Sequence, residues 1–176
     1  MTILGIDPGT AHTGYGVIKV PDDILGREFD YGIELITYDN IVTPKEQIMP
    51  ERLLLIYDKM MHVIETYKPD ALSIEMLFFG TNTKTAISVG QARGVVLLAA
   101  AMHNLPVFDY TGPSVKLMVA GSGRADKKMV QEAVRKWLGT NGEKRAEFAK
   151  LKGGHIDDAI DAVAIAICHV LKLAAK

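Results

Sequence analysis

Cysteine is scarce in this sequence, since Cys168 is its single cysteine and lies in an apolar run. A lone thiol cannot form a disulfide within the chain, and neither a CxxC pair nor a Cys/His pattern with zinc spacing is present. The sequence also lacks an apolar run of the roughly 18 residues that a membrane span needs. Its N-terminus leads directly into strand-like sequence, without the basic segment and cleavage site of an export signal. We therefore expect a soluble protein of the reducing cytoplasm.

Neither sign of charge dominates, because the sequence has 20 Lys and Arg residues and 21 Asp and Glu residues, which gives a formal net charge of −1. This balance gives no global case for nucleic-acid binding, although a clustered acidic site would mask a basic surface in such a sum. The 176 residues suit one domain, residues 1–176, that can bury a full core without disulfides. Internal repeats and low-complexity tracts are absent.

The periodicity of apolar residues predicts five strands and five helices. The expected strands are residues 2–7, 13–20, 31–41, 71–75 and 105–108. The expected helices are residues 52–67, after Pro44 and Pro50, and residues 84–103, 114–119, 127–137 and 155–173. Three early strands followed by alternating helices and strands indicate an α/β fold with a mixed sheet.

Acidic residues recur at the ends of these elements. Asp7 ends the first strand, Glu75 ends a buried strand, and Asp158 and Asp161 share one face of the last helix. Carboxylates gathered from distant segments are how a protein builds an oxygen-ligand site for magnesium. Two alternatives stay open: Asp-Pro-Gly is ordinary turn chemistry, and acids at a helix start also suit the helix dipole. Glu75, followed by apolar residues from Met76 on, is poorly placed for solvation, which favours a ligand or ion-pair role.

Several motifs, in a fixed order, resemble those of the RuvC family of Holliday junction resolvases. They are Gly5-Ile6-Asp7-Pro8-Gly9-Thr10, Thr13-Gly14-Tyr15-Gly16-Val17-Ile18, Ser73-Ile74-Glu75, Gly90-Gln91-Ala92-Arg93-Gly94 and Asp158-Ala159-Ile160-Asp161. The resemblance runs from residue 3 to about residue 170 and implies a ribonuclease-H-like fold, with a mixed central sheet flanked by helices. It also implies a homodimer that nicks four-way DNA junctions with magnesium. By that likeness Asp7, Glu75, Asp158 and Asp161 are the four catalytic acids.

Hydrolysis of a phosphodiester needs an activated water and a stabilised leaving oxygen, and two metal ions about 4 Å apart supply both. We therefore expect two Mg²⁺ ions per site, replaceable by Mn²⁺, with Asp7 bridging both ions. Glu75 and one helix acid would complete the ligand shells, and in-line attack by water would leave 5′-phosphate and 3′-hydroxyl ends. Paired, symmetric nicks require two active sites and hence a two-fold dimer. We expect the dimer interface to use the helix surface around Val89–Met102. The alternative is that this apolar surface packs within one subunit.

Further side chains are candidates for contacting DNA. They are Phe78, Lys84, Arg93, Lys116, Arg124, Lys127 and Lys128. By the resemblance, Lys116 and Lys127 lie near the scissile phosphate, and Phe78 would wedge between unstacked bases. The alternatives are solvated lysines and a Phe78 packed in the core. His155 is a candidate for a hydrogen bond that orients the metal ligands. The alternative, for both His155 and Asp157, is an ordinary residue at the start of the last helix.

Other functions fit part of this pattern. An actin-like or sugar-kinase ATPase also carries Asp-x-Gly-Thr after a strand, but it needs a second lobe for which this chain is too short. A ribonuclease-H-like nuclease acting on RNA–DNA hybrids or other branched DNA would keep the acids, and stays open. A non-catalytic junction-binding module would not need four of them. Residues 139–154 and 21–28 are extended relative to the family pattern, so docking to a branch-migration helicase complex also stays open.

Overall fold

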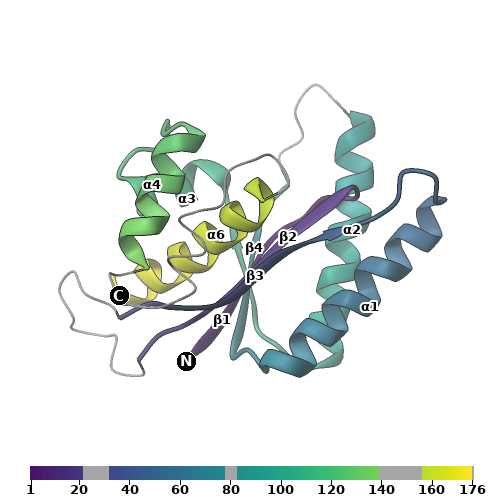
Figure 1. Cartoon of the computed structure of the whole chain (residues 1–176), viewed down its shortest axis with the longest axis horizontal. Coiled ribbons are helices and arrows are strands. Elements are labelled where there is room, and N and C mark those ends of the chain that lie inside the picture. The colour runs from purple at the N-terminus through teal and green to yellow at the C-terminus, as the bar shows by residue number, and fades with distance from the viewer. Residues whose placement is uncertain (22–31, 78–82, 139–155, 176) are drawn as a thin grey trace.

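The computed structural model describes residues 1–21, 32–77, 83–138 and 156–175 (Figure 1). The strands within these ranges are β1 (Thr2–Asp7), β2 (His12–Lys19), β3 (Glu34–Val42), β4 (Ala71–Glu75) and β5 (Val107–Tyr110). The helices within them are α1 (Met49–Tyr67), α2 (Thr83–Met102), α3 (Gly112–Ala120), α4 (Lys127–Trp137) and α6 (Asp157–Ala174). None of these helices is long and apolar enough to span a bilayer.

The five strands form one mixed sheet in the order β3-β2-β1-β4-β5. β1 pairs antiparallel with β2, and β2 pairs antiparallel with β3. β4 lies parallel to β1 on one side and to β5 on the other. The predicted α/β fold with a mixed sheet is confirmed, and the parallel pairing puts the carboxyl ends of β1, β4 and β5 at one edge.

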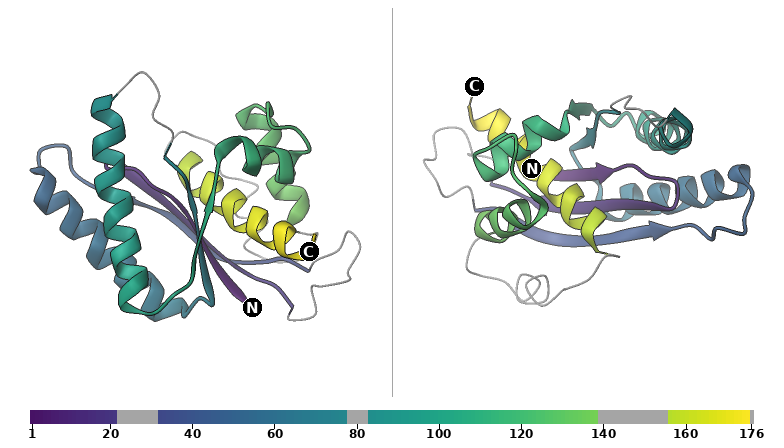
Figure 2. Two further views of the ribbon diagram at one scale, coloured as in Figure 1. Left: turned by 180° about the vertical axis from the view of Figure 1, so that it is seen from behind. Right: turned by 90° about the horizontal axis from the view of Figure 1, so that it is seen from above.

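Helices cover both faces of the sheet (Figure 2). Alternation along β1 sends Leu4 and Ile6 to the core under α1 and α2, whereas Ile3 points to the core under α3, α4 and α6. The same period of two puts Asp7, at the end of β1, on the face that α6 covers. Leu72 and Ile74 of β4 likewise join the α1 and α2 core, so Glu75 also falls on the α6 face.

α6 packs on β1 and β2 at glycines. A Cβ atom built on Gly5 would overlap the carbonyl oxygen of Ala162, and one built on Gly14 would overlap the carbonyl of Asp158. Gly16 is equally close to Val163. A strand presents its backbone to a helix this closely only where it carries no side chain. The glycines therefore set how near the start of α6 comes to the end of β1.

Some predicted boundaries need correction. The last strand was expected at residues 105–108, but it spans Val107–Tyr110, and Leu105 still donates its N–H to the carbonyl of Ala100 in α2. Asn104 ends the turn after α2 in a left-handed conformation, with φ of 52°, so the chain needs Leu105 to leave the helix. Pro50 does not precede the first helix but lies in its first turn, where a missing N–H costs no hydrogen bond. The last helix begins at Asp157, two residues later than predicted.

Replacing Gly5 with Ala should destabilise the protein by about 3 kcal/mol, because the added methyl group forces α6 off the sheet. Chemical denaturation would measure this loss as a lower free energy of unfolding. Gly94→Ala in α2 is the matched control, since its Cβ would meet no atom of the described residues within 4 Å. That variant should gain up to about 1 kcal/mol from helix propensity. Equal effects of the two substitutions would contradict the role given to Gly5.

Candidate active site

The site begins with two neighbouring parallel strands that each end in an acid. Ile6 of β1 lies opposite Ile74 of β4, so the next residue of each strand, Asp7 and Glu75, comes to the same edge of the sheet. Both side chains point to the face covered by α6, as the alternation of buried residues requires. The rest of each strand is mostly buried, whereas Asp7 and Glu75 are only partly buried.

The start of α6 adds two more acids. Asp158 and Asp161 are three residues apart and lie on one side of the helix. One carboxylate oxygen from each of Asp7, Asp158 and Asp161 lies within 4.8 Å of the others. Three carboxylates this close form an oxygen-rich site of the kind that a hard divalent cation selects. The structure thus brings together three of the four predicted ligands.

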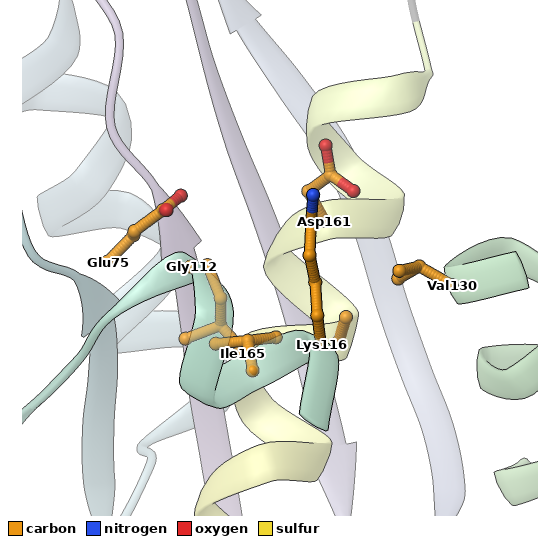
Figure 3. Close-up of a pocket in the computed structure, with 8 residues that line it drawn as sticks. Glu75, Gly112, Lys116, Val130, Asp161 and Ile165 are labelled. Carbon is orange, nitrogen blue, oxygen red and sulfur yellow. The ribbon is translucent and has the colours of Figure 1, made fainter. Parts of the chain in front are cut away.

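Glu75 lies beside this group of three acids rather than within it. It lines a cleft of about 220 Å³ together with Gly112, Lys116 and Asp161 (Figure 3). In Figure 3 the Glu75 carboxylate and the Lys116 side chain both reach into the space in front of Asp161. A Cβ atom on Gly112 would lie 2.7 Å from Oε1 of Glu75, so the glycine leaves room for this carboxylate. The cleft places Glu75 where it shares its surroundings with Asp161.

Burial and like charge make the acids reluctant to ionise. Burial, and then the charges of Glu75, Asp161 and Asp158, raise the pKa of Asp7 from 3.8 to about 8. Burial and the charge of Asp161 raise the pKa of Glu75. Burial also raises the pKa of Asp161, although the Lys127 ammonium opposes this. Carboxylates that repel one another in a poorly hydrated place are stabilised by a bound cation, so the residues present fit a divalent metal ion.

Two lysines approach the acids from the neighbouring helices. Nζ of Lys127, the first residue of α4, lies 3.1 Å from Oδ2 of Asp157 and 3.8 Å from Oδ2 of Asp161. Burial alone would lower the pKa of Lys127, but the hydrogen bond to Asp157 and the charge of Asp161 outweigh it and raise the pKa. Lys116 of α3 lowers the pKa values of Glu75 and Asp161. Lys116 and Lys127 thus lie beside the acids, and their predicted contact with the scissile phosphate stays a prediction.

Of the other predicted site residues, the structure describes the side chains of only some. Lys128 and Arg124 are exposed near the start of α4. Lys84 belongs to α2, but its side chain lies outside the described residues, as do Phe78 and His155. Their predicted roles therefore stay predictions.

Sequence reasoning missed two features of the site. Asp157 accepts a hydrogen bond of 3.0 Å from Nε2 of Gln131 as well as the one from Lys127, so it joins α4 to the start of α6. The helical spacing of Lys127 and Gln131 was the available signal, because residues four apart share a helix face. Arg93 was considered for a DNA backbone contact, yet its guanidinium forms an ion pair with Asp109. No local sequence pattern predicts the Arg93–Asp109 ion pair, because it joins α2 to β5.

The chain is similar to known proteins over nearly its whole length. A family model described as Crossover junction endodeoxyribonuclease RuvC matches residues 3–169. The protein of that name from Desulfitobacterium hafniense (strain DSM 10664 / DCB-2) is 49% identical over 169 residues, covering 96% of this chain and 92% of the relative. The one from Syntrophomonas wolfei is 45% identical over 170 residues, covering 97% and 88%. The solved structure of T. thermophilus RuvC in complex with Holliday junction substrate matches with a TM-score of 0.82 at 30% identity, covering 99% of this chain and 96% of that one.

Replacing Asp7 with Asn should stabilise the metal-free protein at pH 8 by at least about 1 kcal/mol, which is roughly 2–4 °C in melting temperature. The pKa of Asp7 is about 8 when folded and near 3.8 when unfolded, so the unfolded chain releases this proton first. The wild-type protein therefore becomes less stable as the pH rises from about 4 to 8, whereas the amide side chain of the variant does not titrate and causes no such loss. Thermal melts in EDTA at pH 4.5 and pH 8 would measure the difference. A gain of the same size at both pH values would contradict the assignment.

Proposed function

We propose that this chain, which belongs to the RuvC family of crossover junction endodeoxyribonucleases, resolves four-way (Holliday) DNA junctions by paired, symmetric nicks. The observation that carries the proposal is the meeting of Asp7, Asp158 and Asp161 within 4.8 Å, at the end of a parallel strand, in a chain that matches a family member bound to a Holliday junction. Family membership supplies the substrate class, and the acids supply the chemistry.

The acids would hold the metal ions. Asp7, Asp158 and Asp161 form the central group, and Glu75 extends it along the cleft toward Lys116. Bound Mg²⁺ supplies a Lewis acid for the phosphate and lowers the pKa of a coordinated water toward neutrality. Four carboxylates in one place can serve two ions, which is the number we propose, with Mn²⁺ as a substitute. Asp7 would serve both ions, because the charges of Glu75, Asp161 and Asp158 all raise its pKa and so all act on its carboxylate.

The lysines would receive the substrate. Lys116 and Lys127 reach the acids from α3 and α4, so a phosphodiester entering the cleft meets ammonium groups beside the metal ligands. Their positive charge stabilises the phosphate as negative charge grows on its oxygens. The oxygen of water bonds to phosphorus while the bond to the 3′ oxygen breaks. The proposed products are a 5′-phosphate and a 3′-hydroxyl, the latter having gained a proton.

A second copy of the chain would complete the enzyme. α2 exposes Ile87, Leu98 and Met102, which are 63%, 55% and 58% exposed, while its opposite side packs in the core through Val96 and Ala100. Together these three side chains form an exposed apolar stripe on α2. A two-fold dimer through this stripe gives two active sites for two nicks. Cytoplasmic location and docking to a branch-migration helicase complex stay predictions.

A synthetic four-way junction should be nicked symmetrically in Mg²⁺ and left intact in EDTA, while duplex, flap and RNA–DNA hybrid are cut far more slowly. Asp158→Asn is expected to bind the junction with wild-type affinity and to lose at least ~100-fold in cleavage rate, because it removes a metal ligand but no DNA contact. Denaturing gels with each strand labelled in turn would measure cleavage, and native gel shifts in EDTA would measure binding. Preferential cutting of the hybrid would favour the alternative ribonuclease-H-like activity, and substantial cleavage by Asp158→Asn would reject the ligand assignment.

Leu98→Glu should convert the protein to a monomer, because dimer formation would bury the new carboxylate among apolar side chains, which is costly. Sedimentation velocity would measure the mass, and supercoiled DNA with an extruded junction would show single nicks in place of paired ones. Leu54→Glu in α1 is the matched control, since Leu54 is 59% exposed but lies outside the stripe. Dimers formed by both variants would place the interface elsewhere.

A further inference from the structure

Arg93 lies in the middle of α2. This helix covers the face of the sheet opposite to α6 (Figure 2). One arm of its guanidinium, Nη2, pairs with Oδ1 of Asp109 in β5. Its Nε lies 3.4 Å from the backbone carbonyl oxygen of Glu75, the last residue of β4. The Arg93 side chain is only 18% exposed, against 46% for Asp109. A single half-buried guanidinium thus joins α2 to the ends of two neighbouring strands.

Among the described residues, the pairing of β4 with β1 ends at Ile74, whereas its pairing with β5 includes Glu75. Met76 donates its N–H to the carbonyl of Tyr110 at 2.8 Å, and this bond continues the β4–β5 ladder for one residue beyond Glu75. A strand end loosens readily because it has neighbours on fewer sides. The Glu75 side chain extends from this strand end toward Gly112, where a Cβ atom would lie 2.7 Å from Oε1 of the carboxylate. A small shift of this strand end would therefore move the carboxylate.

We propose that Arg93 is a positioning residue for Glu75, holding the backbone of that acid from the far side of the sheet while Asp109 holds the guanidinium. The planar fork of Arg suits this task, because it can address a carboxylate and a carbonyl together. The inference rests on the proposed function, since it assumes that Glu75 is a metal ligand. It also replaces the idea of a DNA contact, because the charge of Arg93 is already neutralised by Asp109.

The test compares Arg93→Gln and Asp109→Asn, each removing one half of the ion pair. Both variants should need about tenfold more Mg²⁺ for half-maximal thermal stabilisation in the absence of DNA, because a ligand that is no longer held binds more weakly. Both should also lose about tenfold in kcat on the junction, with KM and junction affinity unchanged within about twofold. The double variant should be no worse than either single one, since the two side chains act as a unit.

A DNA contact would give opposite signs. Arg93→Gln would then weaken junction binding, whereas Asp109→Asn, by freeing the guanidinium and removing a negative charge, would strengthen it. That pattern would overturn the positioning role, as would wild-type Mg²⁺ titration and kcat in both variants. Val96→Ala is the matched control, because Val96 is an apolar side chain buried in the same helix and cannot form an ion pair or a side-chain hydrogen bond. It should lower the melting temperature yet keep the wild-type Mg²⁺ midpoint and kcat.

The outcomes also separate this inference from the proposed function. A wild-type protein that binds Mg²⁺ but never cuts junctions would reject the function, and the Mg²⁺ titration of Arg93→Gln would still test the positioning of Glu75. A wild-type protein that cuts junctions, with Arg93→Gln losing only thermal stability to the same extent as Val96→Ala, would reject the positioning role alone.

Discussion

The contact between α6 and the strands β1 and β2 is the constraint on which the site depends. Gly5 and Gly14 leave no side chain between strand and helix, so the carbonyl groups of Ala162 and Asp158 lie directly on the sheet. The same approach carries Asp158 and Asp161 to within ligand distance of Asp7. Packing elsewhere in the core would tolerate a moderate change of volume, but here one methyl group would separate the acids.

This packing holds together charges that repel one another. The raised pKa values of Asp7, Glu75 and Asp161 mean that, without a cation, burial and mutual repulsion disfavour the ionised carboxylates that the fold brings together. The well-packed core on both faces of the sheet supplies the stability that makes this possible. A site that is electrostatically unfavourable when empty binds a divalent cation strongly, which is how the fold prepares for its reaction.

The two helices that carry lysines toward the site, α3 and α4, each begin at a side-chain cap. Thr111 caps α3 by accepting a hydrogen bond from the N–H of Ser114, and Asp126 caps α4 by accepting one from the N–H of Met129. Each capped helix carries one lysine toward the acids, Lys116 on α3 and Lys127 on α4. The caps fix the residues at which α3 and α4 begin, and so which of their side chains face the acids.

The sequence by itself determined the order of strands and helices, because periods of two and 3.6 are local properties of the chain. It also determined that Asp7 and Glu75 end strands and that Asp158 and Asp161 share a helix face. Only the tertiary structure decided that Glu75 lies beside the three aspartates, that Asp157 pairs with Lys127, and that Arg93 reaches Asp109 and the backbone of Glu75. The physical reason is that the distance between two packed surfaces depends on the side-chain volume between them, and this volume comes from residues far apart in the chain.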